Sequence, residues 1–138
     1  FGADGAPCNN NLDMFQEMRL ASFIQKVRLG PTVMRARQVL RMATMGGAEV
    51  LGMADMIGSI EPGKRADLQI LDLEDFHVYP SAGADPYSRI VYAATRGDVD
   101  TVLIDGEVVM EGKEVRTIDK ARVLREADRS LTRLMGRI

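Results

Sequence analysis

The chain has 138 residues, of which 46% are hydrophobic and 28% are charged, and its formal net charge is −2. This length suits one domain or two small subdomains, and the composition favours a buried core over a disordered chain. Acidic and basic residues are interspersed without a basic stripe, so a nucleic-acid partner is not expected. No apolar run reaches the roughly 18 residues of a membrane span, so no membrane partner is expected. The single cysteine, Cys8, excludes an internal disulfide and fits a reducing, cytoplasmic location.

The first residues predict a loop and an incomplete chain. Phe1 is followed directly by a Gly/Asp motif, with no initiator Met and no signal peptide before it. Gly2, Gly5 and Pro7 then indicate turns rather than a regular element. We therefore expect the chain to be a piece of a longer protein.

Two helices are predicted next. The first spans about 12–29, with an Asn at its start to cap the first turn, and Gly30-Pro31 ends it. Its apolar positions leave only a narrow polar stripe, so something must cover most of this helix. The second begins at Thr32 as N-cap and runs to about Thr44, and a further short turn is expected over 48–51.

From Ile57 onward the pattern changes to strands and tight turns. Glu61-Pro62-Gly63-Lys64 predicts a type II turn, because Pro presets φ at its second position and Gly accepts positive φ at its third. Asp105-Gly106 lies between two β-rich runs and predicts a type I′ hairpin. The strands are expected at 68–73, 90–94, 99–104, 107–110 and 114–117, with a loop over 74–88. A last helix is expected from its cap Asp119 to Met135.

Several segments together resemble one enzyme family. They are Gly2-Ala3-Asp4-Gly5-Ala6-Pro7-Cys8-Asn9-Asn10, then Leu12-Asp13-Met14-Phe15-Gln16-Glu17-Met18-Arg19, Met42-Ala43-Thr44, and Gly58-Ser59-Ile60-Glu61-Pro62-Gly63-Lys64-Arg65-Ala66-Asp67-Leu68. A closing hairpin, 102–109, also fits. In this order they are similar to the amidohydrolase superfamily, in particular its methylthioadenosine/S-adenosylhomocysteine deaminase, guanine deaminase and chlorotriazine hydrolase group.

The resemblance implies an α/β plus β fold. Family members have a distorted (β/α)8 barrel with a small β-sandwich built from both ends of the chain. Residues 1–55 would be the C-terminal remnant of the barrel, with residues 1–5 at the end of its last strand followed by the closing helices. Residues 56–118 would be the C-terminal portion of the sandwich, and 119–138 a terminal helix.

The resemblance also implies a metal-activated water, with zinc or iron held by four His and one Asp. Asp4 would be that Asp, acting as metal ligand and as the catalytic proton shuttle; glycines around it let a carboxylate approach a metal closely. This chain has only one His, His77, in the expected sandwich loop. Because a catalytic zinc site needs about three protein ligands, we expect this chain alone to bind no metal and to be inactive.

Other residues near Asp4 carry weaker expectations. Asn9 and Asn10 are candidates either for substrate binding or for capping the next helix. Cys8 is expected to pack rather than to react. Glu17 either orients the loop through a hydrogen bond or lies on a solvated helix face, and His77 is expected at the surface.

Two functions of different class remain open. The first is a hydrolase that removes an amino group, or chloride, from a nitrogen heterocycle such as a purine, nucleoside or triazine, a small-molecule substrate. The alternative is a stand-alone, non-catalytic β-sandwich that serves in binding or assembly. Because the helix at 12–29 has more apolar surface than this chain can obviously cover, a homo-oligomer is expected as well.

Overall fold

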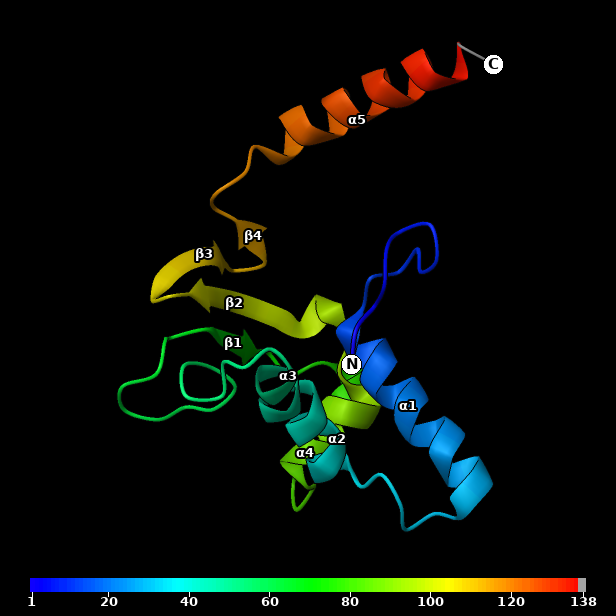
Figure 1. Ribbon diagram of the computed structural model, residues 1–138, viewed down its shortest axis with the longest axis vertical. Helices are drawn as coiled ribbons and strands as arrows, with labels where there is room; N and C mark the ends of the chain where they lie inside the picture. Colours follow the sequence, from blue (N-terminus) through cyan, green and yellow to red (C-terminus); the bar gives the residue numbers. More distant parts are fainter. Residues whose placement is uncertain (137–138) are drawn as a thin grey trace.

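The computed structural model describes residues 1–136, which form a helical part, a small sheet and a separate terminal helix (Figure 1). The helices are α1 (Met14–Leu29), α2 (Ala36–Ala43), α3 (Met45–Val50), α4 (Pro86–Ser88) and α5 (Lys120–Met135). Shorter helical turns are η1 (Phe76–Val78), η2 (Arg89–Ala93) and η3 (Arg96–Asp98). The strands are β1 (Leu68–Leu71), β2 (Val99–Ile104), β3 (Glu107–Glu111) and β4 (Glu114–Val115). None of the helices in residues 1–136 is long and apolar enough to cross a bilayer.

Helix α1 confirms the first predicted helix, but its cap differs from the expected Asn. Asp13 is the N-cap, and its Oδ1 accepts hydrogen bonds from the backbone N–H groups of Phe15 (2.9 Å) and Gln16 (3.3 Å). Asn9 and Asn10 do not cap α1. A carboxylate satisfies the orphan amides of the first turn and also favours the positive end of the helix dipole. At the other end, Gly30 takes φ 96° and donates to the carbonyl of Lys26.

The predicted start of the second helix is wrong. Thr32 is not a cap: α2 begins after Arg35, which makes no side-chain capping bond. Residues 31–35 are instead held against α1, because the hydroxyl of Ser22 donates to the Met34 carbonyl at 3.0 Å. Because of this tertiary contact, α2 begins about one turn later in the sequence than predicted. The short turn expected over 48–51 is observed as α3.

The predicted strand at 90–94 is also wrong, because these residues form the π-helical turn η2 that continues α4. The Asp85 carboxylate accepts from the amide of Ser88 at 2.9 Å, and Pro86 occupies the first turn, which favours a helix start. Val91 and Ala94, three residues apart, are both fully buried. A helical turn places them on one side, against the core, whereas a strand would not place both on one face.

The four strands form one antiparallel sheet in the order β1-β2-β3-β4. The hairpin between β2 and β3 is confirmed as type I′, with φ 52° at Asp105 and 85° at Gly106. The type II turn is also confirmed: Lys64 donates to the Glu61 carbonyl at 3.2 Å, and Gly63 takes φ 91°. The strand predicted at 114–117 is shorter, ending at Val115. This is the only sheet in residues 1–136, and residues 1–5 form no strand. A strand needs a hydrogen-bonded neighbour, and none lies beside them in the described chain.

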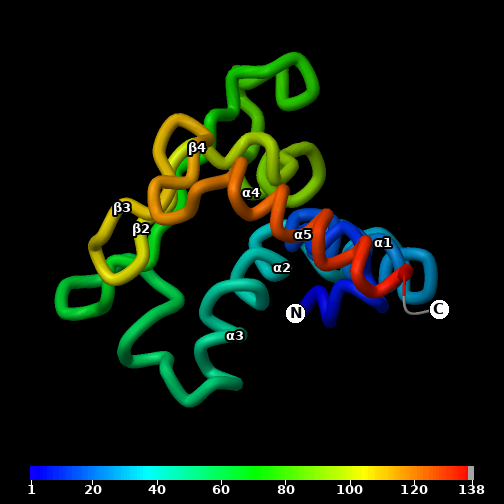
Figure 2. The backbone as a smooth tube through the Cα atoms, turned by 90° about the horizontal axis from the view of Figure 1, so that it is seen from above, coloured from blue at the N-terminus to red at the C-terminus, as the bar shows by residue number. Residues whose placement is uncertain are grey.

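The core lies where α1, α2 and η2 meet. Its buried apolar side chains are Phe15, Met18, Ala36, Val39, Val91 and Ala94. Helix α5 does not contribute, because all of its described residues are exposed and it stands apart from the rest of the chain (Figure 1). In the view from above, the tube of α5 overlaps that of α1, although Figure 1 shows the two helices apart (Figure 2). The helix expected over 119–138 is thus observed as Lys120–Met135 with Asp119 as its cap, and residues 137 and 138 lie outside the described residues.

Candidate functional site

The N-terminal loop presents Asp4 at the surface. Asp4 is exposed and takes φ 58°, a left-handed conformation that Asp tolerates better than most residues. Its Oδ1 accepts the amide hydrogen of Gly5 at 2.7 Å. The Gly5 carbonyl in turn accepts from the amides of Cys8 (2.9 Å) and Asn9 (3.0 Å), which closes a turn directly after Asp4. The backbone therefore holds Oδ1 of Asp4, and Oδ2 accepts no hydrogen bond within the described residues.

Asn9 connects this loop to α1. Its Nδ2 donates to Glu17 Oε1 at 2.6 Å, and its Oδ1 accepts from the Asn11 amide at 3.2 Å. Glu17 thus orients the loop through a hydrogen bond, which was one of its two predicted roles. Both ends of the Asn9 side chain are used in holding the loop, whereas Asn10 is exposed and makes no side-chain hydrogen bond within the described residues. Of the two Asn candidates, only Asn10 keeps its amide free for a substrate.

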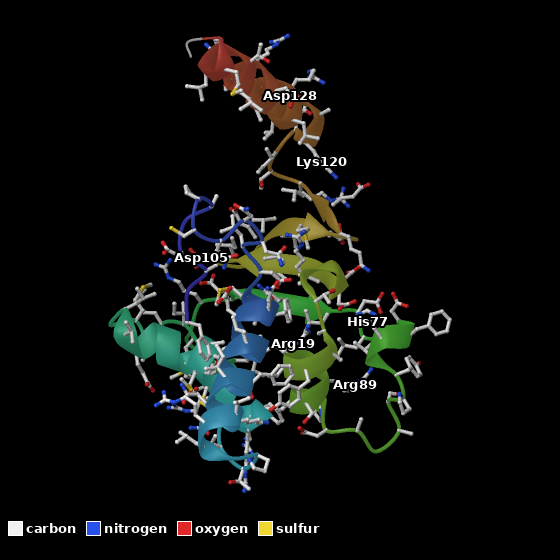
Figure 3. The ribbon with its side chains drawn as sticks, turned by 90° about the vertical axis from the view of Figure 1, so that its right-hand side faces the viewer. Arg19, His77, Arg89, Asp105, Lys120 and Asp128 are labelled. Carbon is white, nitrogen blue, oxygen red and sulfur yellow. The ribbon has the colours of Figure 1, made fainter. Side chains whose placement is uncertain are left out.

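Two arginines tie the loop and α1 to the segment before β2. Arg96 Nη1 donates to the Asn11 carbonyl at 2.9 Å, and Arg19 Nη2 donates to the Ala94 carbonyl at 2.7 Å. Figure 3 shows Arg19 on α1 beside the η2 segment. The prediction that Cys8 packs against other residues is wrong, because Cys8 is exposed. It lies in a loop that the rest of the described chain does not cover.

A second polar cluster surrounds Asp98, which is only 4% exposed. Its Oδ2 accepts from the amide of Thr95 (2.7 Å), the hydroxyl of Thr95 (3.0 Å) and Nε2 of His77 (2.9 Å). Burial alone would raise the pKa of this carboxyl, but the hydrogen bonds from His77 and Thr95 outweigh it and hold the pKa of Asp98 below its usual value. His77 lies at the surface as predicted, on η1 (Figure 3). Its ring nevertheless connects η1 to η3, which directly precedes β2.

Sequence reasoning missed the Asp98 cluster, although one signal was present. Thr95-x-x-Asp98 has the spacing of a capping box, and the structure contains that box around η3. His77 is 21 residues from Asp98 and no local pattern joins them.

The residues present do not by themselves fit a catalytic metal. Among residues 1–136, no three His, Cys, Asp or Glu side chains lie close enough together to hold an ion. Asp4 offers one carboxylate, and the Asp98–His77 pair is engaged in its own hydrogen bonds. A catalytic zinc site requires about three protein ligands. Any further ligands to a metal at Asp4 would have to come from outside this chain.

Comparison with known proteins identifies the family. The sequence pattern described as "Amidohydrolase family" matches residues 1–109, which is more than half of the chain. The chain belongs to the amidohydrolase family. The match includes Asp4, the Asn9–Glu17 contact and the hairpin through most of β3, whereas α5 lies beyond it.

Curated amidohydrolase relatives are similar along almost the whole chain. A 5-methylthioadenosine/S-adenosylhomocysteine deaminase from Desulforudis audaxviator is 50% identical over 135 residues, which are 97% of this chain and 31% of the relative. A 5'-deoxyadenosine deaminase from Methanobrevibacter smithii is 41% identical over 134 residues, 96% of this chain and 31% of that protein. The chain therefore spans about a third of the length of the relatives it matches.

Solved amidohydrolase structures share the arrangement. An adenosine deaminase from Xanthomonas campestris with bound zinc superimposes with a TM-score of 0.90 and 38% identity, covering 96% of this chain and 30% of that one. An atrazine chlorohydrolase from Arthrobacter aurescens complexed with zinc and atraton gives a TM-score of 0.74 at 27% identity, covering 88% of this chain and 27% of that one. Both neighbours hold zinc.

Proposed function

We propose that this chain is part of a longer metal-dependent hydrolase that deaminates an adenosine derivative, with water replacing the amino group and ammonia leaving. The observation that carries the proposal is the 50% identity to a 5-methylthioadenosine/S-adenosylhomocysteine deaminase over 97% of this chain. A 5'-deoxyadenosine deaminase among the relatives supports the same substrate class. A chlorinated triazine is a weaker candidate, because the atrazine chlorohydrolase is only 27% identical.

Asp4 is the catalytic residue that we propose within this chain. Its carboxylate is exposed, and the Gly5 amide fixes Oδ1, so Oδ2 is free to act as a metal ligand and to carry a proton from water to the departing amine. A bound zinc or iron would supply a Lewis acid that lowers the pKa of water. Since Asp4 is the one metal ligand proposed in the described chain, the other metal ligands would come from the longer protein. Asn10, with its free amide, is the proposed substrate contact, while Asn9 supports the loop.

The proposed division of the longer fold follows the same reasoning. Residues 1–55 would close its barrel, with residues 1–5 pairing as the end of a strand once a neighbouring strand is present. Residues 56–118 would supply the β1–β4 sheet to a sandwich whose other strands come from the rest of the protein, and α5 would be the terminal helix. The open outer edge of β1 supports this division, because a sheet edge is a ready site for strand pairing.

A chimera tests the function. The matched 135-residue region of the Desulforudis audaxviator deaminase is replaced by this chain, and ammonia release is measured with 5-methylthioadenosine, S-adenosylhomocysteine and 5'-deoxyadenosine. We expect deamination by the chimera and none by the isolated chain. Asp4→Asn should lower kcat by at least about 100-fold, as loss of a general acid–base group does. Asp55→Asn removes another exposed carboxylate and should leave kcat unchanged.

Two results would contradict the proposal. One is a folded, zinc-loaded chimera that deaminates none of the three substrates. The other is full activity in the Asp4→Asn variant. The stand-alone β-sandwich module is less well supported, because the described strands form a single sheet and α1 has an uncovered apolar face. A cytoplasmic location and a homo-oligomer stay predictions.

A further inference from the structure

The Asp4 loop, residues 4–12, is contacted by a distant segment of the chain. Arg96 lies on η3, and its Nη1 donates to the carbonyl of Asn11 at 2.9 Å, across 85 residues of sequence. Leu12, which follows Asn11, takes φ 46°. This left-handed conformation is unfavourable for a bulky residue and persists only where surrounding contacts hold it. The hydrogen bond from Arg96 lies at the neighbouring residue, so it restrains the loop where the backbone needs support.

Consecutive hydrogen bonds connect the residue held by Arg96 to Asp4. The Asn11 amide donates to Asn9 Oδ1 at 3.2 Å, and the Asn9 amide donates to the Gly5 carbonyl at 3.0 Å. The Gly5 amide in turn donates to Asp4 Oδ1 at 2.7 Å. Each of these residues is therefore restrained by the next one, and a displacement of Asn11 loosens the restraints on the Asp4 carboxylate.

The η3 turn is a fixed support for this contact, because it is held from two directions. Thr95 and Asp98 form its capping box, and Asp98 also accepts from His77. From the other direction, Arg19 of α1 donates from Nη2 to the Ala94 carbonyl at 2.7 Å. An arginine on a fixed turn loses only side-chain freedom when it binds a distant carbonyl, and an ionised donor makes a stronger hydrogen bond than a neutral one.

We propose that Arg96 is a positioning residue for Asp4, which it orders through the carbonyl of Asn11. The proposal rests on the function proposed above, in which Asp4 is the catalytic carboxylate. Glu17 restrains the loop from α1 through Asn9. Among the hydrogen bonds of residues 1–136, the bond from Arg96 is the one that joins the Asp4 loop to a segment beyond α1. In the proposed division of the chain, residues 56–118 would thus help to order a catalytic group that belongs to residues 1–55.

Three variants of the chimera with the Desulforudis audaxviator deaminase test this role. Arg96→Ala removes the donor, and Arg96→Lys keeps a cationic donor. Arg35→Ala is the matched control, because Arg35 is also exposed and donates to a backbone carbonyl outside the Asp4 loop, that of Thr32, at 3.3 Å. We measure kcat and KM at saturating zinc with the substrate that the unmodified chimera deaminates fastest. Hydrogen exchange of the loop, residues 4–12, is measured by mass spectrometry in the zinc-free chimera, so this readout does not depend on activity.

We expect Arg96→Ala to lower kcat about ten-fold while KM changes less than about two-fold, because misplacement of a proton-transfer group affects the chemical step more than substrate binding. Arg96→Lys should recover most of the lost kcat, since its ammonium can still donate to the Asn11 carbonyl. Arg35→Ala should leave kcat unchanged. Exchange of the loop should become at least about three-fold faster in Arg96→Ala, because the loop opens more often.

Three results would overturn the proposed role of Arg96. They are an unchanged kcat in Arg96→Ala, an equal loss of kcat in Arg35→Ala, and unchanged exchange of the loop in Arg96→Ala. A chimera that deaminates none of the three substrates refutes the proposed function instead. In that case the exchange rates still decide whether Arg96 holds the loop.

Discussion

Replacing Asp98 with Asn should destabilise the chain by about 3 kcal/mol. The carboxylate is buried, and its Oδ2 accepts three hydrogen bonds from His77 and Thr95, between 2.7 and 3.0 Å. Hydrogen bonds to a charged group contribute about 1.5–3 kcal/mol and neutral ones about 0.5–1.5 kcal/mol. Asn keeps the shape and one acceptor but loses the charge, so each bond weakens by about 1 kcal/mol. For a domain of this size the melting temperature should fall by roughly 10 °C.

The assay is urea unfolding followed by circular dichroism, with Asp100→Asn as the control. Asp100 lies two residues away on β2, and its side chain accepts one local hydrogen bond, from Thr101 Oγ1 at 2.8 Å. Its substitution should change the unfolding free energy by less than about 1 kcal/mol. Equal effects of the two substitutions would show that the three contacts to Asp98 do not act as a charge-assisted cluster.

The same cluster makes stability depend on pH in a defined direction. Because the pKa of Asp98 is lower in the folded chain, its contribution is fully present above the unfolded value of about 3.9 and is lost as the pH falls through the lower folded value. The difference in unfolding free energy between the wild type and Asp98→Asn should therefore shrink as the pH falls below about 4. A difference that keeps growing below about pH 4 would refute this reasoning.

Two further substitutions test local geometry by the same unfolding measurement. Gly58→Ala should destabilise by about 3 kcal/mol, because the new Cβ would lie 2.9 Å from the Ala48 Cβ and 3.0 Å from Met45 Sδ at φ 93°. Gly52→Ala, with φ 68° and no atom within 4 Å, should cost only about 1 kcal/mol, and equal losses would refute the steric argument. Asp13→Ala should cost about 1–2 kcal/mol by removing the cap of α1, whereas Asn10→Ala should cost nothing measurable. Identical midpoints for those two variants would mean that the cap contributes no stability.

Elements whose conformation is decided by adjacent residues were predictable from the sequence. Asp105-Gly106 needs positive φ at both positions, and this requirement alone specifies the β2–β3 hairpin. Asp119 likewise caps α5 as expected, accepting from the Arg122 amide at 2.9 Å. Neither result depends on a distant part of the chain. The role of Asp4 stays a prediction, which rests on the Gly-Ala-Asp-Gly motif and on the family that it resembles.

Elements decided by distant contacts were not predictable in the same way. The run Ile90–Ala94 is apolar at every position except the Tyr92 hydroxyl, so periodicity does not separate a strand from a helix. The deciding interaction is the packing of Val91 and Ala94 into the core formed with α1 and α2. The Asp85-Pro86 pair was the available local signal for a helix start. The cap of α1 was mispredicted for a different reason. The residue types at Asn9, Asn10, Asn11 and Asp13 can all cap a helix. Only the hydrogen bond between Asn9 and Glu17 shows that Asn9 has another role.

The loop that carries Asp4 is ordered by contacts made within this chain. Glu17 holds Asn9, Arg96 holds the carbonyl of Asn11, and Asp13 fixes the start of α1. Fixing a loop opposes binding through lost conformational entropy, on the order of 1–2 kcal/mol for each residue. Here much of that ordering accompanies folding of the chain, so docking of the remaining protein would meet an Asp4 that is already positioned. By contrast, Val27 on α1 is 88% exposed, so this chain does not cover it. If Asp4 is a metal ligand, its positioning and the completion of its site are therefore separate events, and the Asp4→Asn variant of the chimera reports on the completed site.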